Sequence, residues 1–135
     1  MSKKDVSGQI FEFDPVIYPL HLWVAIKPQG KIYDVFRMLD EDYNETTELV
    51  KIQPNNVART IAVAHRESDI MGCLVYINLP KLFGAGYISH ESSHVVDWFC
   101  DYLGIGGFSF MDGEARAYLI QWVANCIERV LKHKV

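Results

Sequence analysis

Two histidines and a glutamate stand close together in the second half of the chain, in the segment His90-Glu-Ser-Ser-His94. On an α-helix, residues i and i+4 lie on one face, so the two imidazoles can converge on one metal ion. Glu91 is offset by one residue, which places its carboxylate beside the metal, where it can take a proton from a metal-bound water. The spacing therefore indicates a hydrolytic zinc site.

A tetrahedral catalytic zinc site needs a third protein ligand and leaves one position for water. Glu114, twenty residues after His94, is our candidate, because a helix, a glycine-bearing loop and an antiparallel helix would return it to the level of His90. The alternative is that the histidines only pack or face solvent. A site of two histidines and one carboxylate also suits iron, so the choice between zinc and another divalent ion stays open.

The segment His90-Glu91-x-x-His94, followed by Glu114, resembles the gluzincin metallopeptidases, of which thermolysin is a member. The resemblance implies that His90, His94 and Glu114 hold one zinc ion and that Glu91 is the general base. It implies a zincin-like fold. It also implies that the strand before the motif helix, here residues 73–79, forms an upper edge along which the substrate lies.

Segments 112–118 and 18–24 are similar to small zincin-like proteins encoded by phages and mobile elements. The chain departs from thermolysin-like enzymes because only 21 residues follow Glu114. We therefore expect no counterpart of the C-terminal subdomain that forms the second wall of their cleft. We expect an open or shallow cleft, or one that a second subunit completes.

Two further roles fall to neighbours of the motif. Tyr118, one helical turn after Glu114, is the first candidate for the catalytic group that stabilises the oxyanion. The alternatives for this role are Tyr87, Arg116 and His65. Asp97, three residues after His94, is expected to orient that imidazole from outside the ligand set through its free ring nitrogen.

The elements of the first half are predicted to be mostly strands. β-branched and aromatic residues predict a strand at 16–26, whereas apolar residues at helical spacing predict a short helix at 31–40. The polar, acidic segment 41–56 is expected to be a surface loop. Segments 57–65 and 71–79 are expected to pair as a hairpin, because four polar residues separate two β-like runs.

The second half is predicted to be helical, which makes the chain an α+β protein with a short antiparallel or mixed sheet packed on two long helices. The first helix is expected at 84–103, with Gly104 as its C-terminal cap. The second is expected at 113–133, with Asp112 as its N-terminal cap and an apolar stripe that faces inward. The stripe is expected to consist of Ala115, Tyr118, Leu119, Trp122, Val123, Cys126, Ile127, Val130 and Leu131.

Composition limits the function further. The 135 residues fit a single domain spanning 1–135, and a net charge of −4 argues against nucleic-acid binding. The sequence contains no membrane span and no signal peptide, and its three cysteines are widely spaced. We therefore expect a cytoplasmic protein, in the host cytoplasm if a phage encodes it, with buried free thiols.

Two functions remain as hypotheses. The first is a zinc metallopeptidase that hydrolyses a peptide or protein substrate. The second is a metal-stabilised protein with little or no catalytic activity that binds a host or partner protein, with segment 41–56 as a contact surface. A homo-oligomer is compatible with both.

Overall fold

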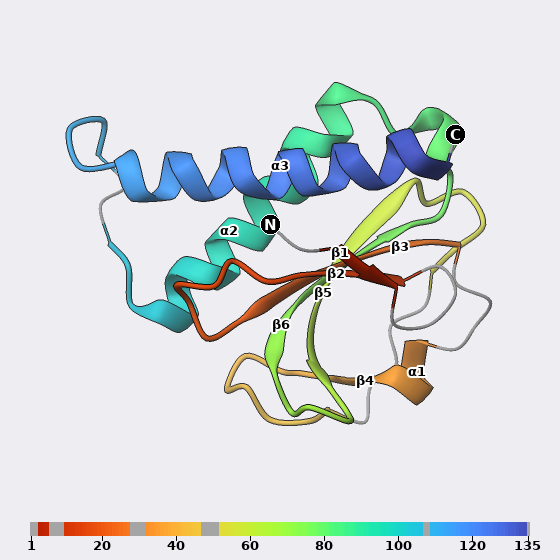
Figure 1. Cartoon of the computed structure of the whole chain (residues 1–135), viewed down its shortest axis with the longest axis horizontal. Coiled ribbons are helices and arrows are strands. Elements are labelled where there is room, and N and C mark those ends of the chain that lie inside the picture. Colours follow the sequence, from red (N-terminus) through yellow and green to blue (C-terminus); the bar gives the residue numbers. More distant parts are fainter. Residues whose placement is uncertain (1–2, 6–9, 28–31, 47–51, 107–108, 135) are drawn as a thin grey trace.

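The computed structural model describes residues 3–5, 10–27, 32–46, 52–106 and 109–134, and for 3–5, 133 and 134 only the backbone. It confirms the α+β class, with strands in the first half and two long helices in the second (Figure 1). The strands are β1 (Lys3–Asp5), β2 (Ile10–Phe13), β3 (His21–Ile26), β4 (Phe36–Met38), β5 (Ala58–His65) and β6 (Met71–Ile77). The helices are α1 (Ile32–Val35), α2 (Ala85–Leu103) and α3 (Glu114–Lys134), with a 3₁₀ turn at Pro80–Leu82.

The described strands form one mixed sheet in the order β1-β2-β3-β6-β5-β4. The predicted hairpin is confirmed, because β5 and β6 pair antiparallel from Ala58↔Ile77 to Ala64↔Met71. β3 runs parallel to β6 on its other side. The expectation that residues 73–79 form an edge strand is therefore wrong. Strand order depends on pairing between distant segments, and the buried run in β6 is typical of a strand covered on both faces.

The open edge lies on β5 instead. β4 pairs with β5 only at Val63, Ala64 and His65, and the main-chain oxygen of Ala62 accepts a further hydrogen bond from Leu39. Within the described part of the chain, residues 58–61 pair only with β6. This half of β5 lies beneath α2, so it is the strand that borders the His90–His94 segment.

Alternating residues of the sheet form two cores. On one face, side chains such as Val24 and Val75 pack against α2 and α3. On the other face, Trp23 and Leu74 pack with side chains of α1 and of the edge strand β4, and α1 lies on the side of the sheet away from the two long helices (Figure 1).

Both long helices agree with their sequence patterns. α2 ends at Gly104, which has a left-handed φ of 70° and donates its main-chain N–H to the last turn. The predicted inward stripe of α3 is confirmed for the residues that are buried, namely Leu119, Val123, Cys126, Ile127 and Val130. Tyr118 and Ala115, which we placed in the same stripe, are exposed. No helix in the described ranges is long and apolar enough to cross a membrane.

The helix expected at 31–40 is only partly correct. α1 covers a single turn, and the chain then continues as β4. Phe36 and Met38 are both buried and face one side, as alternate strand residues do, because they pair with His65 and Val63. In the expected loop 41–56, residues 47–51 lie outside the described residues, and Glu45 forms an isolated bridge with Leu39.

The three cysteines are buried, as expected from their apolar surroundings, and are not joined in disulfides. Burial raises the pKa of the Cys126 thiol to about 12, and that of Cys73 further still. Neither thiol is therefore a nucleophile near neutral pH.

Gly72 is predicted to be intolerant of a side chain. It pairs with His21 in the parallel contact between β3 and β6, and an added Cβ would overlap the His21 main-chain oxygen. We expect Gly72→Ala to lower the free energy of unfolding by about 3 kcal/mol, measured by urea denaturation. Gly86→Ala is the control, because a Cβ there meets nothing within 4 Å, and its unfolding free energy should change by less than about 1 kcal/mol. An equal effect of both changes would contradict this account.

Candidate metal centre

His90 and His94 lie on the exposed face of α2 and their rings converge. The two Nε2 atoms are 3.2 Å apart, and the ring centroids are 4.8 Å apart in an edge-to-face arrangement. Two nitrogens bound to a tetrahedral zinc at about 2.0–2.1 Å stand roughly 3.3 Å from each other. The separation also allows one ring to donate a hydrogen bond to the other. The pair therefore has the spacing that two ligands of one zinc ion require.

Glu91 is turned away from solvent beside this pair. It is only 5% exposed, and its Oε2 atom lies 3.8 Å from His90 Nε2. Its other carboxylate oxygen, Oε1, accepts a hydrogen bond of 2.9 Å from the hydroxyl of Thr60 on β5. The side chain is thus held by one oxygen and presents the other towards the histidines.

The sequence analysis missed Thr60. A threonine within a strand carries no local signal of this role, because its contact with Glu91 spans 31 residues of sequence. The Thr60 Oγ1 atom also lies 3.4 Å from the main-chain oxygen of Glu91. This residue therefore ties the first turns of α2 to the open half of β5.

An open pocket of about 540 Å³ lies beside His90 and Glu91. Its lining residues come from the start of β5, the segment before it and the first turns of α2: Asn55, Asn56, Val57, Ala58, Gly86, Tyr87, His90 and Glu91. An extended segment laid along the open edge of β5 would therefore pass the imidazole of His90 and the carboxylate of Glu91.

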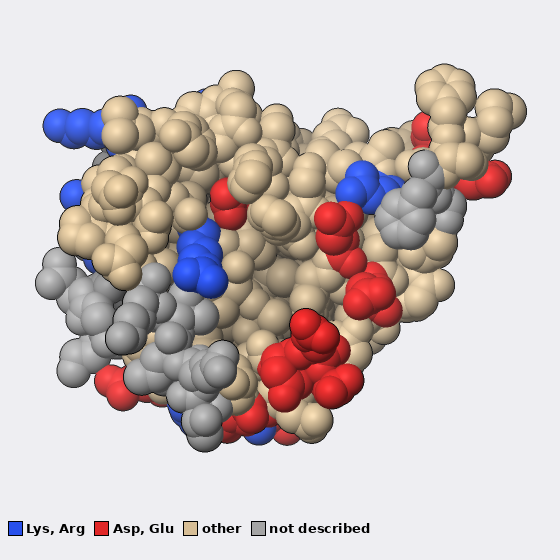
Figure 2. All heavy atoms as spheres, turned by 180° about the vertical axis from the view of Figure 1, so that it is seen from behind, with Lys and Arg blue, Asp and Glu red and all other residues tan. Residues whose placement is uncertain are grey.

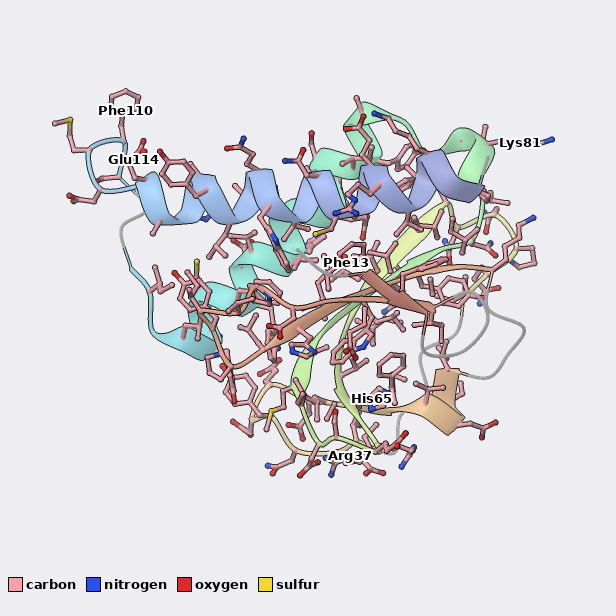
Figure 3. All side chains as sticks on the ribbon, viewed as in Figure 1. Phe13, Arg37, His65, Lys81, Phe110 and Glu114 are labelled. Atoms are coloured by element: carbon pink, nitrogen blue, oxygen red, sulfur yellow. The ribbon has the colours of Figure 1, made fainter. Side chains whose placement is uncertain are left out.

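Glu114 is not brought to the histidines. It is exposed at the first position of α3, next to the loop that carries Phe110 (Figure 3). Arg116, two residues after Glu114, pairs with Asp97 of α2. The start of α3 therefore lies beside the part of α2 that is one helical turn beyond His94. Within the described ranges, no three His, Cys, Asp or Glu side chains gather as a metal site would require. The assignment of Glu114 as third ligand stays a prediction.

Asp97 is engaged elsewhere than expected. Its Oδ1 atom accepts a hydrogen bond of 2.6 Å from Arg116 Nη2. The carboxylate therefore links α2 to α3, and the orienting role towards His94 stays a prediction without a contact to support it.

The candidates for the oxyanion role are dispersed. Tyr118 is 66% exposed and lines a different pocket, together with Ile17 and Trp122. Tyr87 is the candidate that shares the pocket with His90, and its ring stacks on Phe83.

The other two candidates are occupied by packing and pairing. His65 stacks on Trp23 and meets the edge of Phe36, on the far side of the sheet from α2 (Figure 3). Arg116 is paired with Asp97. Neither His65 nor Arg116 is therefore placed to stabilise an oxyanion beside the histidine pair.

A second, acidic hollow lies at the other end of the contact between β5 and α2. Asp40, Glu41, Asp42 and Asp101 line it, with the rings of Tyr43 and Trp98 as its walls. Trp98 stacks on Tyr102, and Tyr43 meets both rings edge-on. Figure 2, which views the molecule from behind, shows acidic side chains gathered on this face.

The hydrogen bond between Thr60 and Glu91 is predicted to stabilise the fold. Thr60→Val removes the donor and leaves a buried carboxylate oxygen without its partner, which should cost about 1–3 kcal/mol of unfolding free energy in denaturant titrations. Thr60→Ser keeps the hydroxyl and should recover most of this loss. If Val and Ser destabilise the protein equally, the hydrogen bond is not the source of the effect.

Comparisons with known proteins assign no family to this arrangement. The chain matches no protein-family model, no curated protein and no solved structure. The functional argument therefore rests on the geometry of the residues themselves, and above all on the histidine pair and the buried glutamate between them.

Proposed function

We propose that the protein is a zinc-dependent hydrolase of peptide bonds, with His90 and His94 as metal ligands and Glu91 as the general base. One observation carries the proposal: the Nε2 atoms of the two histidines converge at 3.2 Å beside a buried carboxylate. This arrangement suits two imidazoles that share one ion, with a carboxylate facing them that Thr60 holds by a hydrogen bond.

Two ligands are proposed from both sequence and geometry, and the third from the sequence alone. His90 and His94 would bind through Nε2, and Glu114 is the third ligand that the sequence resemblance supplies. When bound, zinc acts as a Lewis acid and lowers the pKa of a coordinated water to about 7. Iron is the alternative metal for the same donors.

Glu91 is suited to move a proton at one defined atom. Thr60 holds Oε1, whereas Oε2 faces His90. We therefore assign to Oε2 the acceptance of the proton from the attacking water and its transfer to the leaving amine. For the oxyanion we favour Tyr87 over Tyr118, because Tyr87 lines the pocket that contains Glu91.

The shape of the site favours an extended peptide as substrate. Residues 58–61 of β5 have main-chain groups that an added strand can pair with, and the pocket beside them is open. A peptide bound along this edge would have a carbonyl close to the histidine pair. The free thiols agree with a reducing compartment, so we place the protein in the cytoplasm.

The acidic hollow favours a second candidate function. A pocket with four carboxylates and aromatic walls is suited to a basic side chain of a partner protein. In this case the metal would only stabilise the fold, and the protein would act by binding.

Zinc content and peptide turnover, measured on the same preparations, separate the two functions. The wild-type protein should carry one zinc ion by mass spectrometry and cleave members of a broad peptide library. Glu91→Gln should keep the zinc and lose at least about 100-fold in turnover, because the general base is absent. His90→Ala should lose both. Glu128→Gln, an exposed α3 residue paired with Lys132, is the matched control and should change neither.

The contrary outcomes are distinct. Stoichiometric zinc without cleavage of any library peptide would contradict the hydrolase and favour the binding protein. Equal metal content in wild type and His90→Ala would contradict both functions, because the histidine pair would then have no metal to hold.

A further inference from the structure

Large apolar side chains are exposed at the start of α3, in the loop before it and in the loop between β2 and β3. This set, hereafter the apolar face, consists of Val16, Ile17, Phe110, Met111 and Tyr118. Phe110 is fully exposed and projects from the loop ahead of α3, away from the rest of the fold (Figure 3). Soluble monomers seldom leave large apolar side chains so open without a partner for them.

The same face also contains a groove. Its lining residues carry no charge and are mostly apolar or aromatic: Pro15, Ile17, Tyr18, Ala115, Tyr118, Leu119 and Trp122. The α3 members recur at intervals of three and four residues, so they form one stripe along the helix. The molecule thus presents an apolar projection and, a few turns away, an apolar groove.

We propose that this face binds the same face of a second copy of the chain, forming a two-fold dimer. Ala115 lies near the midpoint between the projection at Phe110–Met111 and the far end of the groove at Trp122. A two-fold axis beside Ala115 would place the α3 helices antiparallel, so that each Phe110 reaches the other copy's groove. An isologous interface of this kind uses one self-complementary patch twice.

The surface available is sufficient for such a dimer. If about 200 Å², the size of an aromatic side chain, is taken for each fully open residue of the apolar face, its exposed fractions amount to at most roughly 800 Å² per copy. A standard-size interface buries about that area on each partner. No charged residue is among the described residues that line the groove, so the groove itself adds no repulsion between two chains that each carry a net charge of −4.

The first test is the molar mass in solution by sedimentation or light scattering at micromolar concentration. The wild-type protein should have twice the chain mass of 15.5 kDa. The double variant Phe110→Ser with Met111→Ser should dimerise at least 10-fold more weakly, and it should fold normally because both side chains are exposed in the monomer. Leu82→Ser is the control, since Leu82 is exposed and apolar but outside the apolar face.

The second test places a cysteine beside the axis. Ala115→Cys should form a disulfide-linked dimer under mild oxidation, because the two copies of this position would face each other. Gln121→Cys, also exposed on α3 but outside the groove, should not. The three native thiols are buried, so background cross-linking should be low.

A monomeric wild-type protein, or a dimer that the loop substitutions leave unchanged, would overturn the proposal. Cross-linking of Gln121→Cys as readily as Ala115→Cys would also overturn it. So would a monomer that binds neutral lipid vesicles through Phe110, since the apolar face would then belong to a membrane contact. His90 and Glu91, whose variants test the hydrolase proposal, lie outside the apolar face, so the zinc and turnover measurements test that proposal separately.

Discussion

The seating of α2 on β5 and β6 is the contact on which the candidate site depends. Val95, Val96 and Phe99 are fully buried on the inner face of α2, and this packing fixes the rotation of the helix about its axis. Once that rotation is fixed, residues 90 and 94 must lie on the outer face. Glu91, at the boundary between the faces, is directed against the strand. The hydrophobic core therefore determines which side of the motif is open and which is closed.

This arrangement gives the three motif residues different environments. The imidazoles are exposed and free to bind an ion, whereas the carboxylate is buried and anchored to Thr60 through one oxygen. A carboxylate in such a position has few alternative rotamers, and preorganisation of this kind is what a general base needs. The acidic hollow lies further along the same helix, and the apolar face lies at the start of α3 and in two loops outside it. Neither of these features requires the metal.

The sequence predicted those features that depend on interactions between neighbouring residues. The i, i+4 histidine pair, the Gly104 cap and the hairpin between β5 and β6 follow from neighbouring residues alone. The apolar residues at 32, 35, 36 and 39 have helical spacing, but the pairing of Phe36 and Met38 with β5 makes this part of the segment a strand. The inner position of β6 depends on β3, which is distant in sequence.

The positions of Glu114, Asp97 and Thr60 depend on how the helices and strands are packed against one another, and sequence spacing does not specify that packing.

The central claim is that His90 and His94 bind one metal ion together. X-ray absorption at the zinc edge, recorded on the zinc-loaded protein, tests it most directly. We predict two imidazole nitrogens at about 2.0–2.1 Å, with the remaining positions taken by oxygen. One imidazole should disappear in His94→Ala, and one oxygen should change in Glu114→Gln if that residue is the third ligand. A shell of oxygens alone, or a spectrum that His94→Ala leaves unchanged, would contradict the account.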